Sequence, residues 1–229
     1  VSDNSDINRQ FPGNFDGEPT SRLAANLFQK IKGFRYGIHF PSFYRHGDFI
    51  PHVRMSSTGK ESASLANLFG LPYVITSKQR NFDKSTLNYN WQIEGTDAFS
   101  IYSGATGNVD EKLAKQAVSA VLRFLTRMGI LKYNCHNGYI ASIIEEEDMV
   151  QVKATSAGFF RRFAKIDEEV HRGQLLGEIL DPYEGTLLSE VRSSVDGIVF
   201  FCANQPTILE NATAFQVIKK LQIGRASCR

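Results

Sequence analysis

The sequence predicts an α/β domain followed by a small all-β domain. Between residues 21 and 128, segments with helical and strand-like periodicity alternate along the chain. From residue 139 onward, short β-branched runs are separated by Gly, Asp and Pro. Hydrophobic residues make up 42% and charged residues 22% of the 229 positions, a composition typical of packed globular proteins. We therefore expect residues 1–134 to form the α/β domain and residues 135–221 the all-β domain.

Charge and cysteine usage exclude several classes of partner. The formal net charge is +2 and no basic block occurs, so we do not expect a nucleic-acid partner. No run of about 18 apolar residues is present, so no membrane span is expected. Cys135, Cys202 and Cys228 lack C-x-x-C spacing, which argues against a disulfide framework or a cysteine zinc cluster. Free thiols favour a reducing, cytoplasmic location.

Both ends of the chain suggest processing rather than structure. The sequence starts at Val1, inside a loop-like segment, so we expect a true N-terminus upstream. Residues 222–229 read Q-I-G-R-A-S-C-R, have no hydrophobic pattern and resemble a translated sequencing adapter. We expect a non-native tail there, the alternative being a short natural one.

Two helices in the first part have clear boundaries. Leu23, Leu27 and Ile31 repeat at four-residue spacing and predict a helix over 21–32 that Gly33 ends. A longer helix is predicted over 110–128, with Asp110 as N-cap and Gly129 after its end. The remaining expected elements are a helix over 60–69, strands over 36–40, 73–76 and 98–103, a loop over 41–51, and a helix or strand over 87–93.

The second part predicts a small barrel or sandwich. Strands are expected at 139–144, 150–154, 174–179, 185–191, 197–201 and 214–218. Segments 170–174 and 195–199 are similar to the hairpins of biotinyl and lipoyl carrier domains. The turn at 193–197 has no lysine, so we do not expect a covalently attached cofactor. Packing, a lid over the active site or a homo-oligomer interface is the expected role.

Several polar residues are candidates for chemistry. Asn8 and Arg9 stand side by side in D-I-N-R-Q-F-P-G, and the guanidinium fork suits a carboxylate. The alternative for Arg9 is a surface ion pair with Asp3 or Asp6. His39 ends an apolar segment and could hold a metal or be a satisfied core residue.

A second group lies in an aromatic-rich stretch. His46, His52 and Arg54 could line an anionic pocket, or they could belong to a solvated loop. Cys135 and His136 form a weak candidate metal pair, because no further ligands are nearby in the sequence.

Taken together, these motifs resemble the succinylglutamate desuccinylase/aspartoacylase family, which is related to the zinc carboxypeptidases. The resemblance rests on the D-x-N-R-x-F-P-G string, the helix after it, the strand ending in His39 and the strand–Gly turn–helix of 98–128. It covers nearly the whole chain. It implies an α/β/α sandwich around a mixed sheet, with a small all-β barrel-sandwich domain after it.

The resemblance also implies a function. Members hydrolyse an amide bond in an N-acyl amino acid or a similar small carboxylate substrate, with Zn²⁺ as cofactor. His39 falls on one zinc ligand, and the other two, an H-x-x-E pair, are expected upstream of Val1. Asn8 and Arg9 fall on the pair that holds the substrate carboxylate, and we add Arg54 as a further substrate-binding residue. Zinc with three protein ligands lowers the pKa of its water to about 7.

The sequence departs from the family pattern at two positions. Tyr102 occupies the position of the general-base glutamate, and tyrosine, with an ordinary pKa of about 10, is a poor base. It could instead donate a hydrogen bond to an oxyanion. Gly37 stands where the family has an aspartate. Glu94 and Asp97 could supply a substitute carboxylate or be turn residues.

These departures keep two alternatives to the deacylase open. One is a catalytically impaired ligand-binding pseudoenzyme, which Tyr102 motivates. The other is a carboxypeptidase-like peptidase, which the Asn8–Arg9 pair cannot separate from a deacylase. The acidic run at 145–148 is expected to be a solvated turn.

Overall fold

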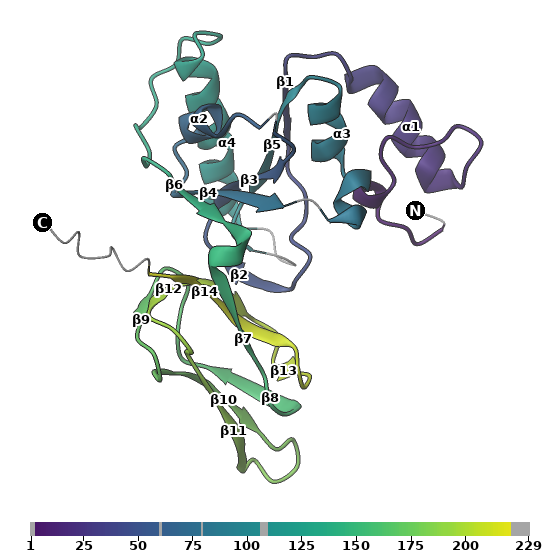
Figure 1. Cartoon of the computed structure of the whole chain (residues 1–229). Helices are drawn as coiled ribbons and strands as arrows, with labels where there is room; N and C mark the ends of the chain where they lie inside the picture. Colours follow the sequence, from purple (N-terminus) through teal and green to yellow (C-terminus); the bar gives the residue numbers. More distant parts are fainter. Residues whose placement is uncertain (1–2, 60, 79, 106–109, 221–229) are drawn as a thin grey trace, which may run out of the picture. The chain divides into compact units, whose positions relative to one another are not determined.

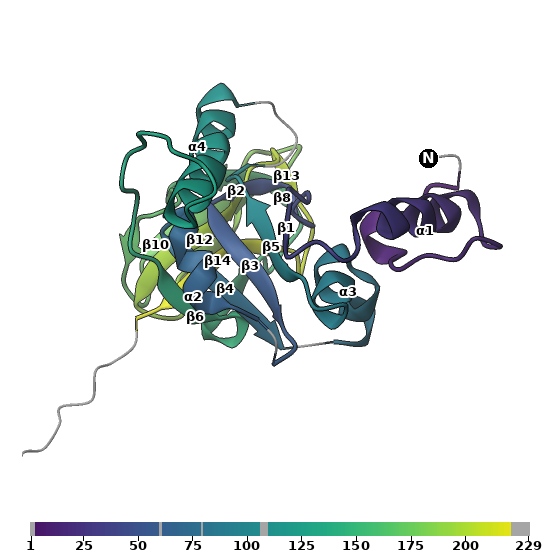
Figure 2. The same ribbon diagram turned by 90° about the horizontal axis from the view of Figure 1, so that it is seen from above.

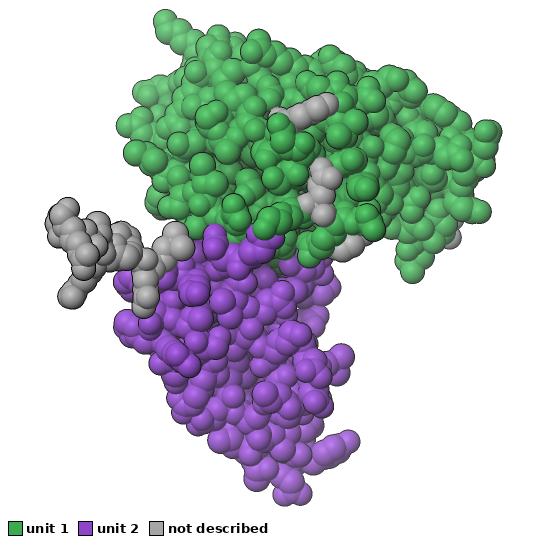
Figure 3. Space-filling model, in the orientation of Figure 1, with its two compact units in different colours: residues 1–43, 51–104, 109–146 green, residues 44–50, 105–108, 147–229 purple. Residues whose placement is uncertain are grey.

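The computed structural model describes residues 3–59, 61–78, 80–105 and 110–220. The chain divides into two compact units, which Figure 3 colours separately. Unit 1 comprises residues 1–43, 51–104 and 109–146, and unit 2 comprises residues 44–50, 105–108 and 147–229. The predicted tail at 222–229, with Cys228, lies outside the described residues, as does part of the glycine turn after residue 105. Among the described residues, no helix is long and apolar enough to cross a membrane.

Unit 1 is built on a mixed five-stranded sheet in the order β1-β5-β3-β4-β6. Strands β1 and β5 run parallel, β3 is antiparallel to β5, and β3, β4 and β6 are mutually parallel along the sheet. This arrangement confirms the predicted α/β fold with a mixed sheet. The strands are β1 (Tyr36–His39), β3 (His52–Ser57), β4 (Tyr73–Lys78), β5 (Asp97–Tyr102) and β6 (Ser142–Glu145).

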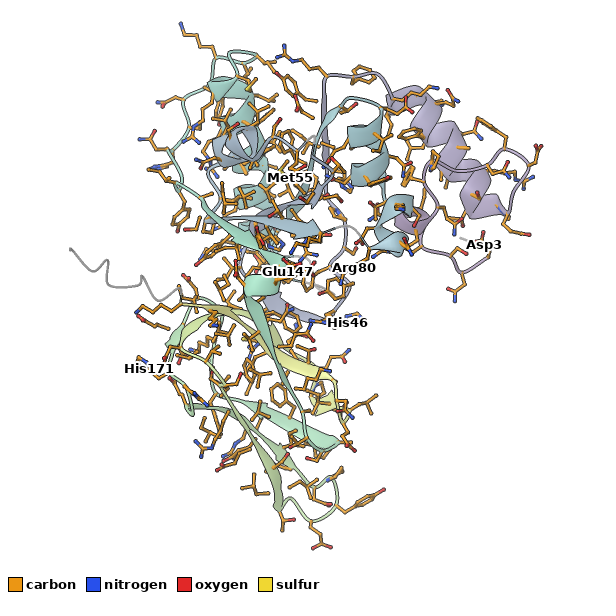
Figure 4. The ribbon with its side chains drawn as sticks, in the orientation of Figure 1. Asp3, His46, Met55, Arg80, Glu147 and His171 are labelled. Carbon is orange, nitrogen blue, oxygen red and sulfur yellow. The ribbon has the colours of Figure 1, made fainter. Side chains whose placement is uncertain are left out.

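One face of this sheet is apolar and is covered by α2 (Ala63–Ala66), the 3-10 helix η2 (Asn67–Phe69) and α4 (Glu111–Arg127) (Figure 1). The rings of Phe69 and Phe124 stack with their centroids 4.5 Å apart. Met55 of β3, labelled in Figure 4, belongs to the same buried cluster. The other members from the strands are Val53, Val74, Phe99 and Ile101. Burial of these side chains drives the helices onto this face.

The opposite face carries α3 (Leu87–Ile93) and α1 (Pro19–Ile31), so the unit has helix, sheet and helix layers (Figure 2). Trp91 of α3 lies in a buried cluster with Phe28 of α1 and Ala98 of β5. The indole nitrogen of Trp91 donates to the carbonyl of Ile31 at 3.1 Å, which ties the two helices together. Two short 3-10 helices, η1 (Ile7–Arg9) and η3 (Asn81–Ser85), flank this layer.

The predicted helix ends are confirmed where the sequence signals were strongest. The Asp110 side chain accepts hydrogen bonds from the backbone N–H of Lys112 at 2.8 Å and of Leu113 at 3.0 Å, as an N-cap does. Gly129 follows α4 with φ +71°, a left-handed conformation that glycine adopts at little cost. The ambiguous segment 87–93 is the helix α3, and the Thr86 side chain caps it by accepting from Tyr89 N–H at 3.4 Å.

The loop predicted over 41–51 is wrong at residues 47–49, and the solvated loop raised as an alternative for His52 and Arg54 is not what the structure shows. Residues 47–49 form strand β2 (Gly47–Phe49) of unit 2. His52 and Arg54 lie on strand β3, where they alternate with buried Val53 and Met55. This period-two alternation was present in the sequence, but the density of charged and aromatic residues obscured it.

Unit 2 contains a four-stranded sheet and a five-stranded sheet. One sheet has the order β11-β10-β8-β13, and the other runs β2-β12-β14-β7, with β9 paired to β12. Phe160, Leu176, Phe215 and Val217 belong to the buried core of the unit, as expected of a sandwich. The strands are β7 (Met149–Lys153), β8 (Gly158–Arg162), β9 (Glu169–Val170), β10 (Leu175–Leu180), β11 (Leu187–Arg192), β12 (Gly197–Ala203), β13 (Thr207–Ile208) and β14 (Thr213–Lys219).

Five predicted strands of the second part are found in unit 2, namely β7, β10, β11, β12 and β14. Strands β8, β9 and β13 were not predicted. The segment predicted as a strand over 139–144 overlaps β6, which pairs with β4 of unit 1.

Candidate functional site

A row of polar side chains crosses the α3-covered face of the sheet. His39 of β1 is paired in register with Ser100 of β5, and Ser100 is paired with Arg54 of β3. Side chains of registered neighbours point to the same face of a sheet, so these three lie together. The His39 Nε2 and Ser100 Oγ atoms are 2.6 Å apart, a hydrogen-bond distance. Because β1 and β5 run parallel, their last residues, His39 and Tyr102, lie at the same end of the two strands.

His39 is a neutral imidazole at neutral pH. Burial lowers its pKa from 6.5 to about 4, because the positively charged form would lose its hydration. The Trp91 ring stands edge-on to the imidazole, with centroids 5.9 Å apart. A neutral imidazole can accept a hydrogen bond, move a proton or bind a metal.

The described residues do not by themselves fit a zinc site. Among them, no group of three or more His, Cys, Asp or Glu side chains could hold a metal ion. The imidazole nitrogen of His39 instead meets the Ser100 hydroxyl. The pair Cys135–His136 also gains no metal-binding partners within the described part of the chain.

A chain of ion pairs links the two arginines predicted to bind substrate. The Arg54 Nη2 atom lies 3.4 Å from Glu146 Oε1, and the other carboxylate oxygen of Glu146 lies 3.2 Å from Arg80 Nη2. Arg80, labelled in Figure 4, also pairs with Asp83, Nε to Oδ2 at 3.4 Å. The second oxygen of Asp83 lies 3.6 Å from Arg9 Nη1. The structure therefore pairs Arg9 with Asp83, whereas the sequence raised Asp3 or Asp6 as its alternative partner.

Asn8 connects η1 to α3. Its side-chain oxygen accepts a hydrogen bond from the backbone N–H of Leu87 at 3.1 Å. The Asp6 carboxylate in turn accepts from Asn8 N–H at 2.9 Å and caps η1. Asp3 accepts from Thr20 N–H at 2.9 Å at the start of α1. The hydrogen bond between Asn8 and Leu87 therefore holds the segment that carries Asn8 and Arg9 beside the first turn of α3.

Tyr102 lies at the end of β5, directly opposite His52 of β3. Its ring stacks on the His52 imidazole with centroids 4.9 Å apart and an interplanar angle of 7°. Phe43 meets the Tyr102 ring edge-on at 5.6 Å. Tyr102 points to the same sheet face as Ser100, two residues earlier on the strand. His46, the third member of the predicted group, belongs to unit 2.

Four residues of this constellation were missed by sequence reasoning. They are Ser100, Arg80, Asp83 and Glu146. The run at 145–148 was predicted to be a solvated turn, but the Glu146 side chain is only 21% exposed and pairs with two arginines. No sequence signal separates Glu146 from its acidic neighbours, because its partners lie 66 and 92 residues away along the chain.

The two carboxylates considered as substitutes for the missing glutamate have local roles. Glu94 is the C-cap residue of α3. The Asp97 carboxylate accepts a hydrogen bond from the Ser62 hydroxyl at 2.8 Å. Gly37, where the family has an aspartate, faces Trp91 so closely that an added Cβ would lie 2.7 Å from the indole ring. The Trp91 ring of α3 thus occupies the space that an aspartate side chain at position 37 would need.

Solved structures show which class of protein shares this fold. A succinylglutamate desuccinylase/aspartoacylase from Rhodobacter sphaeroides matches 95% of this chain at TM-score 0.78 and 22% identity, over 68% of its own length. A succinylglutamate desuccinylase from a Silicibacter species matches 95% at TM-score 0.79 and 18% identity, again over 68% of its length.

A third match is the ectoine utilization protein EutE (DoeB) from Ruegeria pomeroyi in a product-bound structure. It aligns with 94% of this chain at TM-score 0.76 and 20% identity, over 68% of its length. No protein-family model matches the chain, and no curated protein matches it. The chain therefore has the fold of the succinylglutamate desuccinylase/aspartoacylase proteins, as the sequence motifs predicted.

Proposed function

We propose that the polar face of unit 1 serves an amide hydrolase that removes an acyl group from an N-acyl amino acid or a similar small carboxylate. The observation that carries the proposal is that His39, Ser100 and Arg54 are paired across three neighbouring strands and lie on one face of the sheet. It places a neutral imidazole, a hydroxyl and a guanidinium side by side, in a fold shared with proteins named desuccinylase and aspartoacylase.

Each side chain has a role that its chemistry supports. The guanidinium groups of Arg54 and Arg9 would bind the substrate carboxylate, because their planar donors match its two oxygens. Asn8 would position Arg9, since its own side-chain oxygen is engaged by Leu87 N–H. Tyr102, at the end of β5, would donate a hydrogen bond from its phenolic hydroxyl to the developing oxyanion.

Zinc dependence is part of the proposal, with His39 as the ligand from this chain. Because the described residues do not make a complete site, we assign no step to the metal. The further ligands would be an H-x-x-E pair, a motif that residues 1–229 do not contain. The free thiols of Cys135 and Cys202 suit the cytoplasm, which we propose as the location.

A second candidate function is ligand binding without turnover. Tyr102 favours it, because its ring is packed between His52 and Phe43 at the position where the family has its general base. The activities of two Tyr102 variants distinguish the hydrolase from the binding protein. Loss of a measurable native activity in Tyr102→Phe would support the hydrolase, whereas activity that first arises in Tyr102→Glu would support the binding protein.

The experiment that tests the proposal measures amine release from a panel of N-acyl amino acids. The protein is expressed from its full coding sequence, and its zinc content is determined. Arg54→Gln is compared with Arg161→Gln, which removes an exposed guanidinium of unit 2. We expect amine release that Arg54→Gln reduces at least about tenfold and Arg161→Gln leaves intact. Absence of zinc together with no amine from any substrate would refute the proposal, and faster cleavage of peptides would identify a carboxypeptidase-like enzyme.

A further inference from the structure

The guanidinium of Arg54 is only partly used by the protein. Its Nη2 atom contacts Glu146 Oε1 at 3.4 Å, a long distance for a charge-assisted hydrogen bond. The neighbouring Nε atom is buried and has no hydrogen-bond partner among the described residues. The Nε and Nη2 atoms of a guanidinium can together bind one carboxylate by two parallel hydrogen bonds. In Arg54, Glu146 uses the Nη2 donor and leaves the Nε donor unused. A buried donor without an acceptor is costly, which favours a ligand that supplies one.

Glu146 is shared between two arginines rather than bound tightly by one. Its second oxygen lies 3.2 Å from Arg80 Nη2, so each guanidinium contributes a single long contact. Glu146 opens the three-residue η4 (Glu146–Asp148) directly after the edge strand β6. A side chain on such a short segment can move away without disturbing the sheet.

The charges around Glu146 favour an added anion. Arg9, Arg54 and Arg80 carry three positive charges, and Asp83 and Glu146 carry two negative ones in the same chain of ion pairs. If the Glu146 carboxylate moved away from the arginines, their positive charge would be available to bind an anionic ligand. Arg54 also adjoins Ser100, whose hydroxyl meets His39, so a carboxylate bound here would lie beside the proposed reacting groups.

We propose that Arg54 and Arg80 form a carboxylate subsite that Glu146 occupies when no ligand is bound. A ligand carboxylate takes the place of Glu146 on the Nε–Nη2 edge of Arg54 and completes the two-bond contact that Glu146 leaves unfinished. Glu146 is thus an internal competitor that sets the affinity of the site. The inference rests on the proposed function for the identity of the ligand, and it is tested by binding alone.

The test is a titration of the protein with succinate, compared with the uncharged succinamide, at constant ionic strength. In the native protein, the Nε–H resonance of Arg54, assigned with Arg54→Lys, should shift with succinate and stay unchanged with succinamide. Glu146→Gln should bind succinate about fivefold more tightly, the effect expected from removing one modest ion-pair competitor. Arg54→Gln should lose the binding.

A matched control is available in unit 2. Glu178 is 19% exposed and pairs with Arg161 at 3.0 Å, so Glu178→Gln removes a comparable carboxylate elsewhere. It should leave succinate binding unchanged. Unchanged or weaker binding in Glu146→Gln would overturn the proposal, because a carboxylate that competes for Arg54 must lower succinate affinity while it is present. If that variant does not fold, an Arg54 resonance that fails to respond to succinate overturns it instead. A protein that binds succinate as described but releases no amine would refute the proposed hydrolase and leave this inference standing.

Discussion

Replacing His39 by glutamine should remove roughly 2 kcal/mol of the stability that the protein loses between pH 7 and pH 5. Burial lowers the pKa of His39 to about 4 in the folded protein, against an ordinary value of 6.5. The unfolded chain therefore takes up a proton as pH falls below 6.5, while the folded chain does not until about pH 4. Stability contributed by this group is full above pH 6.5 and decreases as pH falls toward 4. Glutamine is neutral throughout and keeps a polar end near the Ser100 hydroxyl.

The size of the effect follows from the two pKa values. Each pKa unit corresponds to about 1.4 kcal/mol, so the full loss on acidification is roughly 3 kcal/mol. Between pH 7 and pH 5 the linkage relation gives roughly 2 kcal/mol, since the unfolded histidine is already largely protonated at pH 5. Carboxylates titrate mostly below this range and contribute little to the difference.

Urea unfolding at a series of pH values measures this directly. The free energy of unfolding of the wild-type protein should fall by roughly 2 kcal/mol more than that of His39→Gln between pH 7 and pH 5. Histidines other than His39 are present in both proteins and cancel in the comparison. Parallel pH profiles for the two proteins would show that His39 is not buried as a neutral group, and the reasoning would fail.

Three further predictions concern packing and reactivity. Gly37→Ala should lower the free energy of urea unfolding by about 1–3 kcal/mol, because the new Cβ would lie 2.7 Å from the Trp91 ring; equal stability would show that the indole can shift. Asp110→Ala should cost about 1 kcal/mol in the same assay through loss of the α4 N-cap, and no loss would mean that another group replaces it. Cys202 should resist a thiol reagent at pH 8 until urea unfolds the protein, because burial raises its pKa to about 12; labelling of the native protein, located by mass spectrometry, would contradict this.

The sequence predicted the elements whose signals are local. The α4 helix was found with its N-cap at Asp110 and its terminal glycine, because both act within one turn of the helix. The strand ending in His39 was likewise predicted, since its apolar residues are contiguous. By contrast, β3 was missed, because the alternation of His52 and Arg54 with two apolar residues is short, and the strand depends on pairing with β4 and β5.

The site could be predicted only as separate residues. Asn8, Arg9, His39, Arg54 and Tyr102 were each named from motifs, but their neighbours depend on strand register. Ser100 becomes a partner of His39 only because β1 and β5 align these two positions across 61 residues of sequence. The link from Arg54 through Glu146 to Arg80 has the same long-range origin, which is why an acidic run was taken for a solvated turn.

The most direct test of the central claim is to locate where a carboxylate ligand binds. Backbone amide resonances are followed by NMR while an N-acyl amino acid is added, with its carboxamide analogue as control. We expect chemical-shift changes concentrated at the ends of β1 and β5, at Arg54 on β3 and at the start of α3, with the carboxamide causing much smaller ones. Changes confined to unit 2, or equal responses to the acid and the amide, would contradict it.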